Sequence, residues 1–174
     1  MTGVFLITGP SAAGKTTVAA RLAARFPLGV HVEGDIFRRF VVTGRLEMTP
    51  DASPAALEQL RLRYELAAGV TDRYHRAGFT VALEDVIAGP MLTDVVEAIE
   101  GRPLHVVVLM PGVPSLADRD GGRASRGYAA WTVAHLYRLF AEETPPIGLW
   151  LDTSGEDPDD TVDEILRRAH EARV

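Results

Sequence analysis

Eight consecutive residues near the N-terminus, residues 9–16, constrain the fold of this chain more than any other stretch. They read GPSAAGKT, which fills the pattern G-x-x-x-x-G-K-[ST]. In such a loop the glycines let consecutive backbone N–H groups turn inward around a polyphosphate, and the helix that follows points its positive end at the same anion. The sequence therefore predicts a phosphate-binding loop between a strand and a helix.

The segments that flank this loop have the expected patterns. Residues 4–7 are continuously apolar, as in a parallel strand buried on both faces, and Val18, Leu22 and Phe26 recur every four residues, as on a helix. Lys15 is the one lysine among 18 basic residues, at a position that needs a compact point charge. We expect Lys15 to reach the β and γ phosphates of a nucleotide and Thr16 to hold Mg²⁺. The predicted nucleotide contacts of the loop are Gly9, Ser11, Ala12, Ala13, Gly14, Lys15, Thr16 and Thr17.

Length and composition limit the classes of partner. A chain of 174 residues suits a single α/β domain and leaves no room for a separate acceptor domain. The chain has a net charge of −6, whereas proteins that bind nucleic acids or anionic membranes carry clustered positive charge. We therefore expect a small-molecule partner. The absence of cysteine excludes disulfides, a thiolate nucleophile and cysteine zinc sites. Because no signal-like or membrane-spanning apolar run occurs, we expect a cytoplasmic protein. The oligomeric state stays open.

Strand and helix patterns alternate along the chain, which indicates βαβ units. Beyond the first strand, we predict strands at residues 29–34, 79–83, 104–110 and 147–151. Beyond the first helix, we predict helices at residues 36–42, 53–77, 90–100, 132–142 and from residue 157 onward. Residues 111–128 form the least regular stretch, and an irregular segment this long in so small a domain is typically functional. We therefore interpret approximately residues 111–131 as a lid.

Acidic residues follow two of the predicted strands, at the edge where parallel sheets bind ligands. Asp35 comes after the second strand and is our candidate general base for transfer to a hydroxyl; a helix cap and an outer-shell Mg²⁺ ligand remain alternatives. Glu84 and Asp85 close the third strand, where one carboxylate orients Mg²⁺ through water in proteins with this loop. Because successive strand side chains point to opposite faces, we expect one to face the site and the other to cap the next turn.

Three arginines lie close together in the predicted lid. Arg119, Arg123 and Arg126 are spaced by four and three residues, so on a helix they would share one face, and nearby glycines would serve as hinges. Arginines that close over phosphates neutralise charge in the transition state. The alternative is a solvated surface loop with Asp–Arg pairs.

Other candidates are weaker. Arg38 and Arg39 either hold an anionic group of the acceptor or form a solvated helix face. For Tyr128 and Trp131 we favour packing over stacking on a substrate. The tripeptide that begins at Asp72 lies within a predicted helix, and we interpret it as helix surface.

The order of these parts resembles the P-loop small-molecule kinases, a group that includes gluconate and shikimate kinases, chloramphenicol phosphotransferase and the zeta-toxin kinases. The resemblance rests on residues 9–17, 32–35, 119–126 and 149–154. It implies a P-loop NTPase fold, with a five-stranded parallel sheet in the order 2-3-1-4-5, helices on both faces and an Arg-rich lid. It also implies that Asp35 is the base and that Arg119 or Arg123 touches the phosphates. The loop expected near the adenine contains Asp152, Thr153, Ser154 and Gly155.

Together these features predict an ATP- and Mg²⁺-dependent kinase that transfers the γ-phosphate to a hydroxyl of a small molecule, such as an antibiotic or a sugar-like metabolite. The predicted catalytic residues are Lys15, Asp35, Arg119, Arg123 and Arg126, and the predicted metal site uses Thr16 with Glu84 or Asp85. A nucleotide kinase and an ATP-binding switch that acts on a protein partner remain alternatives. The identity of the acceptor stays open.

Overall fold

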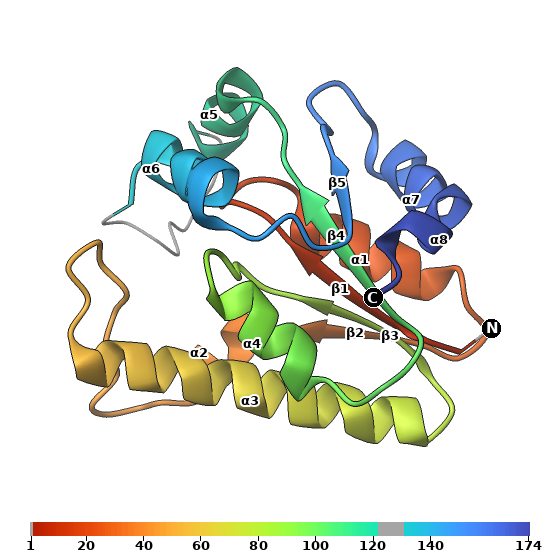
Figure 1. Cartoon of the computed structure of the whole chain (residues 1–174), viewed down its shortest axis with the longest axis horizontal. Coiled ribbons are helices and arrows are strands. Elements are labelled where there is room, and N and C mark those ends of the chain that lie inside the picture. Colours follow the sequence, from red (N-terminus) through yellow and green to blue (C-terminus); the bar gives the residue numbers. More distant parts are fainter. Residues whose placement is uncertain (1, 122–130) are drawn as a thin grey trace.

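Five parallel strands run through the middle of the computed structural model, which describes residues 2–121 and 131–174 (Figure 1). The strands are β1 Val4–Thr8, β2 Gly29–Glu33, β3 Thr80–Glu84, β4 Leu104–Leu109 and β5 Leu149–Leu151. Their spatial order is β2-β3-β1-β4-β5, and every neighbouring pair is parallel. At the centre, Val4 lies beside Val81 on one side and Leu104 on the other. The predicted sheet and strand order are confirmed.

Helices connect the strands and cover both faces of the sheet. In chain order they are α1 Lys15–Ala24, α2 Asp35–Arg39, α3 Pro54–Arg76, α4 Met91–Ala98, α5 Val113–Gly121, α6 Val133–Arg138, the π-helix η1 Leu139–Glu143, α7 Pro158–Arg167 and α8 Ala169–Ala172. Helix α3 begins where the sequence indicates, because Ser53 Oγ accepts the N–H of Ala56 and Pro54 occupies the first turn. None of these described helices is both long and apolar enough to cross a lipid bilayer.

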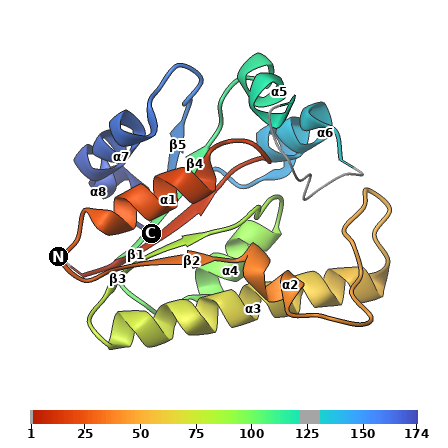
Figure 2. The same cartoon turned by 180° about the vertical axis from the view of Figure 1, so that it is seen from behind.

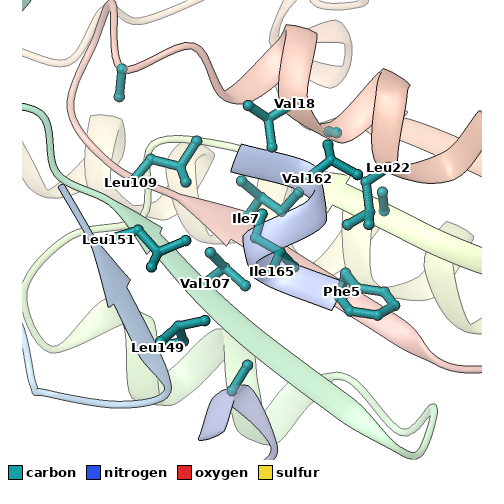
Figure 3. Packing of buried hydrophobic residues seen from close by; sticks show 14 of the residues in the cluster. Phe5, Ile7, Val18, Leu22, Val107, Leu109, Leu149, Leu151, Val162 and Ile165 are labelled. Atoms are coloured by element: carbon teal, nitrogen blue, oxygen red, sulfur yellow. The ribbon is translucent and has the colours of Figure 1, made fainter. Parts of the chain in front are cut away.

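The two faces of the sheet bury two separate hydrophobic cores. Successive β1 side chains alternate between them, since a strand points neighbouring residues to opposite sides. Phe5 and Ile7 pack with α1 and α7 on one face, and Figure 3 shows Val18 of α1 and Ile165 of α7 in that core. Val4 enters the other core, beneath α3 and α4. Figure 1 views the molecule from the α3 and α4 side, and Figure 2 from the α1 and α7 side. Because both faces are covered, β1 is buried throughout its length.

The prediction that residues 111–128 are irregular is wrong for their first half. Helix α5 spans Val113–Gly121, and its Leu116 is fully buried in the core shared with α1 and α7. A tertiary contact therefore stabilises a helix in a segment whose glycine and charge content predicted a loop. The later residues of the predicted lid, 122–130, lie outside the described residues, and with them Arg123, Arg126 and Tyr128.

The interpretation of Asp72 as helix surface is also wrong. Its side chain is only 4% exposed, and its carboxylate accepts hydrogen bonds from the backbone N–H groups of Glu100 and Gly101 at 2.9–3.2 Å. These bonds satisfy backbone donors in the loop that leads into β4. Asp72 is thus a structural residue that joins α3 to that loop.

Candidate functional site

The loop between β1 and α1 has a backbone that its glycines make possible. Gly9 has φ +145°, and a Cβ there would lie 2.2 Å from the carbonyl oxygen of Leu109. Gly14 has φ +92° at the start of α1, and Ala12 also adopts a positive φ of 66°. A non-glycine residue in this region costs roughly 1–2 kcal/mol, and such strain concentrates at functional sites. The loop therefore has the tight, strained turn that brings backbone N–H groups toward an anion.

Lys15 lies across this loop. It is the first residue of α1, its side chain is only 8% exposed, and its Nζ donates a hydrogen bond of 2.8 Å to the carbonyl oxygen of Pro10. The backbone N–H groups of the first turn of α1 face the same loop and carry the positive end of the helix dipole. An ammonium group and a helix N-terminus that meet at one strained loop can hold the phosphates of a nucleotide.

Oxygen atoms suited to a divalent cation lie at the end of the loop. The hydroxyl of Thr16 donates to Glu84 Oε1 at 2.9 Å, and Glu84 is buried at the end of β3, with His31 Nε2 4.0 Å from the same oxygen. Within residues 2–121 and 131–174, no three His, Asp or Glu side chains gather into a metal-binding cluster. One hydroxyl and one carboxylate fit Mg²⁺, which keeps several waters and completes its shell with substrate phosphates.

Asp85 has a different environment from Glu84, although both carboxylates are buried. Arg63 of α3 contacts both carboxylate oxygens of Asp85, with Nε donating to Oδ2 at 2.7 Å, and Val86 N donates to Oδ1 at 2.7 Å. Arg63 and Asp85 are 5% and 4% exposed. The carboxylate of Asp85 is thus engaged in a buried ion pair, and the backbone N–H that it accepts belongs to the next residue, in a segment without a turn. Of the two candidates, Glu84 is the one that contacts Thr16.

Arg63 also links Asp85 to Asp35. Its Nη1 lies 3.3 Å from Asp35 Oδ1, and Arg38 Nε donates to the same oxygen at 3.0 Å. Asp35 is the first residue of α2, and no side chain caps that helix, so the capping alternative is not what the structure has. Gly34 allows this close arrangement, because a Cβ there would lie 2.2 Å from Asp85 Oδ2. Two arginines from different helices therefore orient the Asp35 carboxylate at the end of β2.

Arg63 was missed in the sequence, although a signal for it exists. It follows Leu60 by three residues and precedes Ala67 by four, so it lies on the buried stripe of α3. A buried arginine needs a carboxylate partner. Arg38 and Arg39, by contrast, are engaged in pairs near the surface: Arg38 with Glu47 at 2.6 Å, and Arg39 with Glu33 at 2.9 Å.

A pocket of about 340 Å³ lies beside the start of α1, between α5 and the segment that follows β5. Gly14 and Thr17 line it together with Arg119, whose Nη2 donates to the carbonyl oxygen of Thr153 at 2.8 Å. The fold thus brings Arg119 next to the loop predicted to lie near the adenine.

That loop is tied to the segment before α5. Ser154 Oγ accepts the N–H of Gly112 at 2.8 Å, and hydrogen bonds from the Ser154 hydroxyl and N–H lower the pKa of Asp152. Asp152 itself is exposed, and Gly155 follows in the same turn. The pocket is large enough for a ring system and opens next to the phosphate loop.

Comparison with known proteins shows the family and the fold of the chain. A family model described as an AAA domain matches residues 4–136, more than half of the chain. No protein with curated annotation matches the sequence.

Solved structures share the fold along nearly the whole chain. A sugar kinase from Janibacter sp. is 21% identical, with a TM-score of 0.68, 99% of this chain and 96% of that chain being covered. The tunicamycin resistance protein of Deinococcus radiodurans is 17% identical, with a TM-score of 0.67. The match covers 100% of this chain and 99% of that chain. The APS kinase CysC of Mycobacterium tuberculosis, solved with AMPPNP and APS, is 14% identical, with a TM-score of 0.67. The match covers 95% of this chain and 96% of that chain. The chain therefore has the P-loop fold of the small-molecule kinases.

Proposed function

The chain belongs to this AAA-domain family, and on that premise we propose that it is an ATP- and Mg²⁺-dependent kinase that phosphorylates a hydroxyl of a small molecule. One observation supports this most directly: the carboxylate of Asp35, oriented by Arg63 at 3.3 Å and Arg38 at 3.0 Å, lies at the same edge of the sheet as the phosphate loop and the Thr16–Glu84 pair. A nucleotide-binding switch can act with the loop and the metal site and only slow hydrolysis, whereas transfer to an alcohol also needs a group that accepts the hydroxyl proton.

In this proposal the chain positions the reactants and stabilises charge. The acceptor oxygen forms a bond to the γ-phosphorus as the bond from that phosphorus to the β–γ bridging oxygen breaks, and the electron pair leaves with ADP. The hydroxyl proton passes to Asp35. Lys15 offsets the charge that develops on the phosphate oxygens, and Arg119 reaches the nucleotide from α5. Mg²⁺ at Thr16 and Glu84 would supply further charge neutralisation and orient the phosphates.

The proposal is tested by ATP consumption in the presence of Mg²⁺ across a panel of sugars, nucleosides, nucleoside monophosphates, aminoglycosides and aryl alcohols. Mass spectrometry then identifies any product that carries an added phosphate. We expect one chemical class of alcohol to be phosphorylated. Phosphorylation of nucleoside monophosphates alone would instead indicate a nucleotide kinase. ATP hydrolysis that no small molecule stimulates, but that a protein fraction does, would overturn the kinase proposal in favour of a switch.

A further inference from the structure

A second pocket, of about 190 Å³, lies between α3, the segment that follows β3, and the region of α6 and η1. Val86 and Met91 line it from the β3 side, Tyr64 from α3, and Met48 and Trp131 from segments that flank these elements. Because residues 86–91 directly follow Glu84 and Asp85, this pocket opens at the edge of the sheet that carries the candidate site.

The lining of this pocket is apolar, and the polar side-chain groups of Tyr64 and Trp131 in it have hydrogen-bond partners. The hydroxyl of Tyr64 donates to the carbonyl oxygen of Val86 at 2.7 Å, and burial raises the pKa of Tyr64 to about 12, so the phenol stays neutral. Trp131 Nε1 donates to the carbonyl oxygen of Met48 at 3.1 Å. Among the described residues that line the pocket, none is charged. A charged ligand would therefore lose its hydration there without gaining an ion pair, which is unfavourable.

The pocket is connected to the oriented carboxylate through Arg63. The guanidinium of Arg63 lies 5.9 Å from the centre of the Tyr64 ring, which lines the pocket, and the same guanidinium is 3.3 Å from Asp35. Met48 and Leu60 line both this pocket and a smaller hollow of about 60 Å³ bounded by Arg38 and Arg63. A molecule whose body fills the larger pocket therefore contacts Met48 and Leu60, which also line the hollow that Arg38 and Arg63 border, and these two arginines hold Asp35.

We infer that this pocket holds the body of the phosphoryl acceptor, and that the acceptor is an uncharged alcohol with an apolar ring. The inference rests on the proposed function and specifies its substrate class. A cavity of about 150 Å³ accommodates benzene, so 190 Å³ suits one ring with a short hydroxyl-bearing chain. Met48 and Met91 give the walls flexible side chains that adapt to such a ring. Sugar acids, phosphorylated sugars and nucleotides do not suit this lining.

The first test compares alcohols that carry an apolar ring with polar or charged acceptors. Phenylethanol, cyclohexylmethanol and an aryl propanediol are assayed against gluconate, glucose and adenosine monophosphate, with ATP and Mg²⁺. The Ala88→Phe variant adds a ring inside the pocket, and Ala98→Phe makes the same change at an exposed position of α4. We expect transfer to the ring-bearing alcohols, with an acceptor KM at least 10-fold higher in Ala88→Phe and unchanged in Ala98→Phe. The KM for ATP should be unchanged in both.

A second measurement does not depend on how Ala88→Phe folds. The chain has two tryptophans, so Trp150→Phe leaves Trp131 as the single fluorescent indole, in the wall of the pocket. We expect each ring-bearing alcohol to change its emission at the concentrations that saturate transfer.

The outcomes separate the two proposals. Transfer to a charged acceptor whose KM is the same in Ala88→Phe and the parent protein would overturn the pocket inference and leave the kinase proposal intact. A fluorescence change without transfer to any alcohol would overturn the kinase proposal, and with it the acceptor role of the pocket.

Discussion

The proposed nucleotide side and the proposed acceptor side of the candidate site are built in different ways. The proposed nucleotide side comes mainly from one short segment, residues 9–17, in which backbone groups and a single lysine would hold the phosphates. The acceptor side combines Asp35, Arg63 and Asp85 with an apolar pocket whose walls come from segments far apart in the chain. A backbone loop recognises a phosphate, which every ATP carries, whereas side chains from several elements can change one by one to suit another acceptor.

Loss of Lys15 should have the largest effect, because it removes the charge that the nucleotide side depends on. At an ATP concentration 100 times the Kd, binding should stabilise the parent protein by about 2.7 kcal/mol, and we expect no such stabilisation in Lys15→Ala. Thermal unfolding with and without ATP measures this. Arg21→Ala, which removes a partly exposed cation from the same helix, is the matched control and should respond to ATP like the parent. Unchanged ATP binding in Lys15→Ala would contradict the phosphate-loop assignment.

Asp35→Asn should affect phosphate transfer without affecting nucleotide binding. We expect the rate of phosphate transfer to fall by roughly 10²–10⁴, the usual contribution of a general base, with an unchanged Kd for ATP. Single-turnover kinetics and a separate binding titration measure the two quantities. Glu47→Gln is the control, because it removes another carboxylate partner of Arg38 without altering Asp35. If transfer in Asp35→Asn stays within a few-fold of the parent rate, Asp35 is not the base.

Arg63→Met should destabilise the protein by about 3–5 kcal/mol, because it leaves Asp85 buried without its partner. Arg61→Met, at an exposed position of the same helix, should change stability by less than about 0.5 kcal/mol. The double variant Arg63→Met/Asp85→Leu should recover most of the loss, since it removes both charges. Urea unfolding measures all three. A loss below about 1 kcal/mol in Arg63→Met would show that the pair contributes little to the fold.

Glu84→Gln should lower the apparent affinity for Mg²⁺ more than the affinity for the acceptor. We expect the Mg²⁺ concentration at half-maximal rate to rise about 10- to 100-fold, as is typical when a group that supports a metal site is changed. A Mg²⁺ titration of the transfer rate measures it, and Asp94→Asn at an exposed position of α4 is the control. An unaltered Mg²⁺ dependence would remove Glu84 from the proposed metal site.

The smallest effect should come from His105, which lies near the amino end of β4, away from both sides of the site. Its ring stacks on Phe5 at 4.6 Å between centroids, its Nδ1–H donates to the carbonyl oxygen of Ala169 at 2.8 Å, and burial lowers its pKa. The unfolded chain, with a His pKa of about 6.5, then takes up a proton more readily than the folded one. The free energy of unfolding should thus be highest above that pH and fall as the pH drops toward the lower folded-state pKa.

In His105→Gln this part of the pH dependence should be lost, so its Tm should fall less than that of the parent between pH 8 and pH 6. Thermal unfolding at the two pH values measures the difference, and ATP binding by the variant should equal that of the parent. If the Tm values of the variant and the parent fall equally between pH 8 and pH 6, His105 does not contribute to the pH dependence of stability.

Short-range patterns accounted for much of the fold. The loop, the cap of α3 and the alternation of strands and helices can all be recognised from patterns that span a few residues, and the structure has them. The sheet order came from the family resemblance and is confirmed. Helix α5 and the burial of Asp72 were predicted wrongly, because the core residues that bury Leu116 of α5, and the loop at Glu100 that binds Asp72, lie far from them in the chain.

The sequence alone indicated that the chain has a phosphate loop and that Asp35, Glu84 and Asp85 follow strands that end at one edge of a sheet. Motif spacing can be read from a short segment, and the alternation of strand and helix patterns predicts that the strands are parallel. Only the tertiary structure decided that Glu84 faces Thr16 while Asp85 pairs with Arg63, and that Arg63 also reaches Asp35. It likewise created the apolar pocket. These contacts join residues dozens of positions apart, and packing between helix and sheet, which no short pattern encodes, selects them.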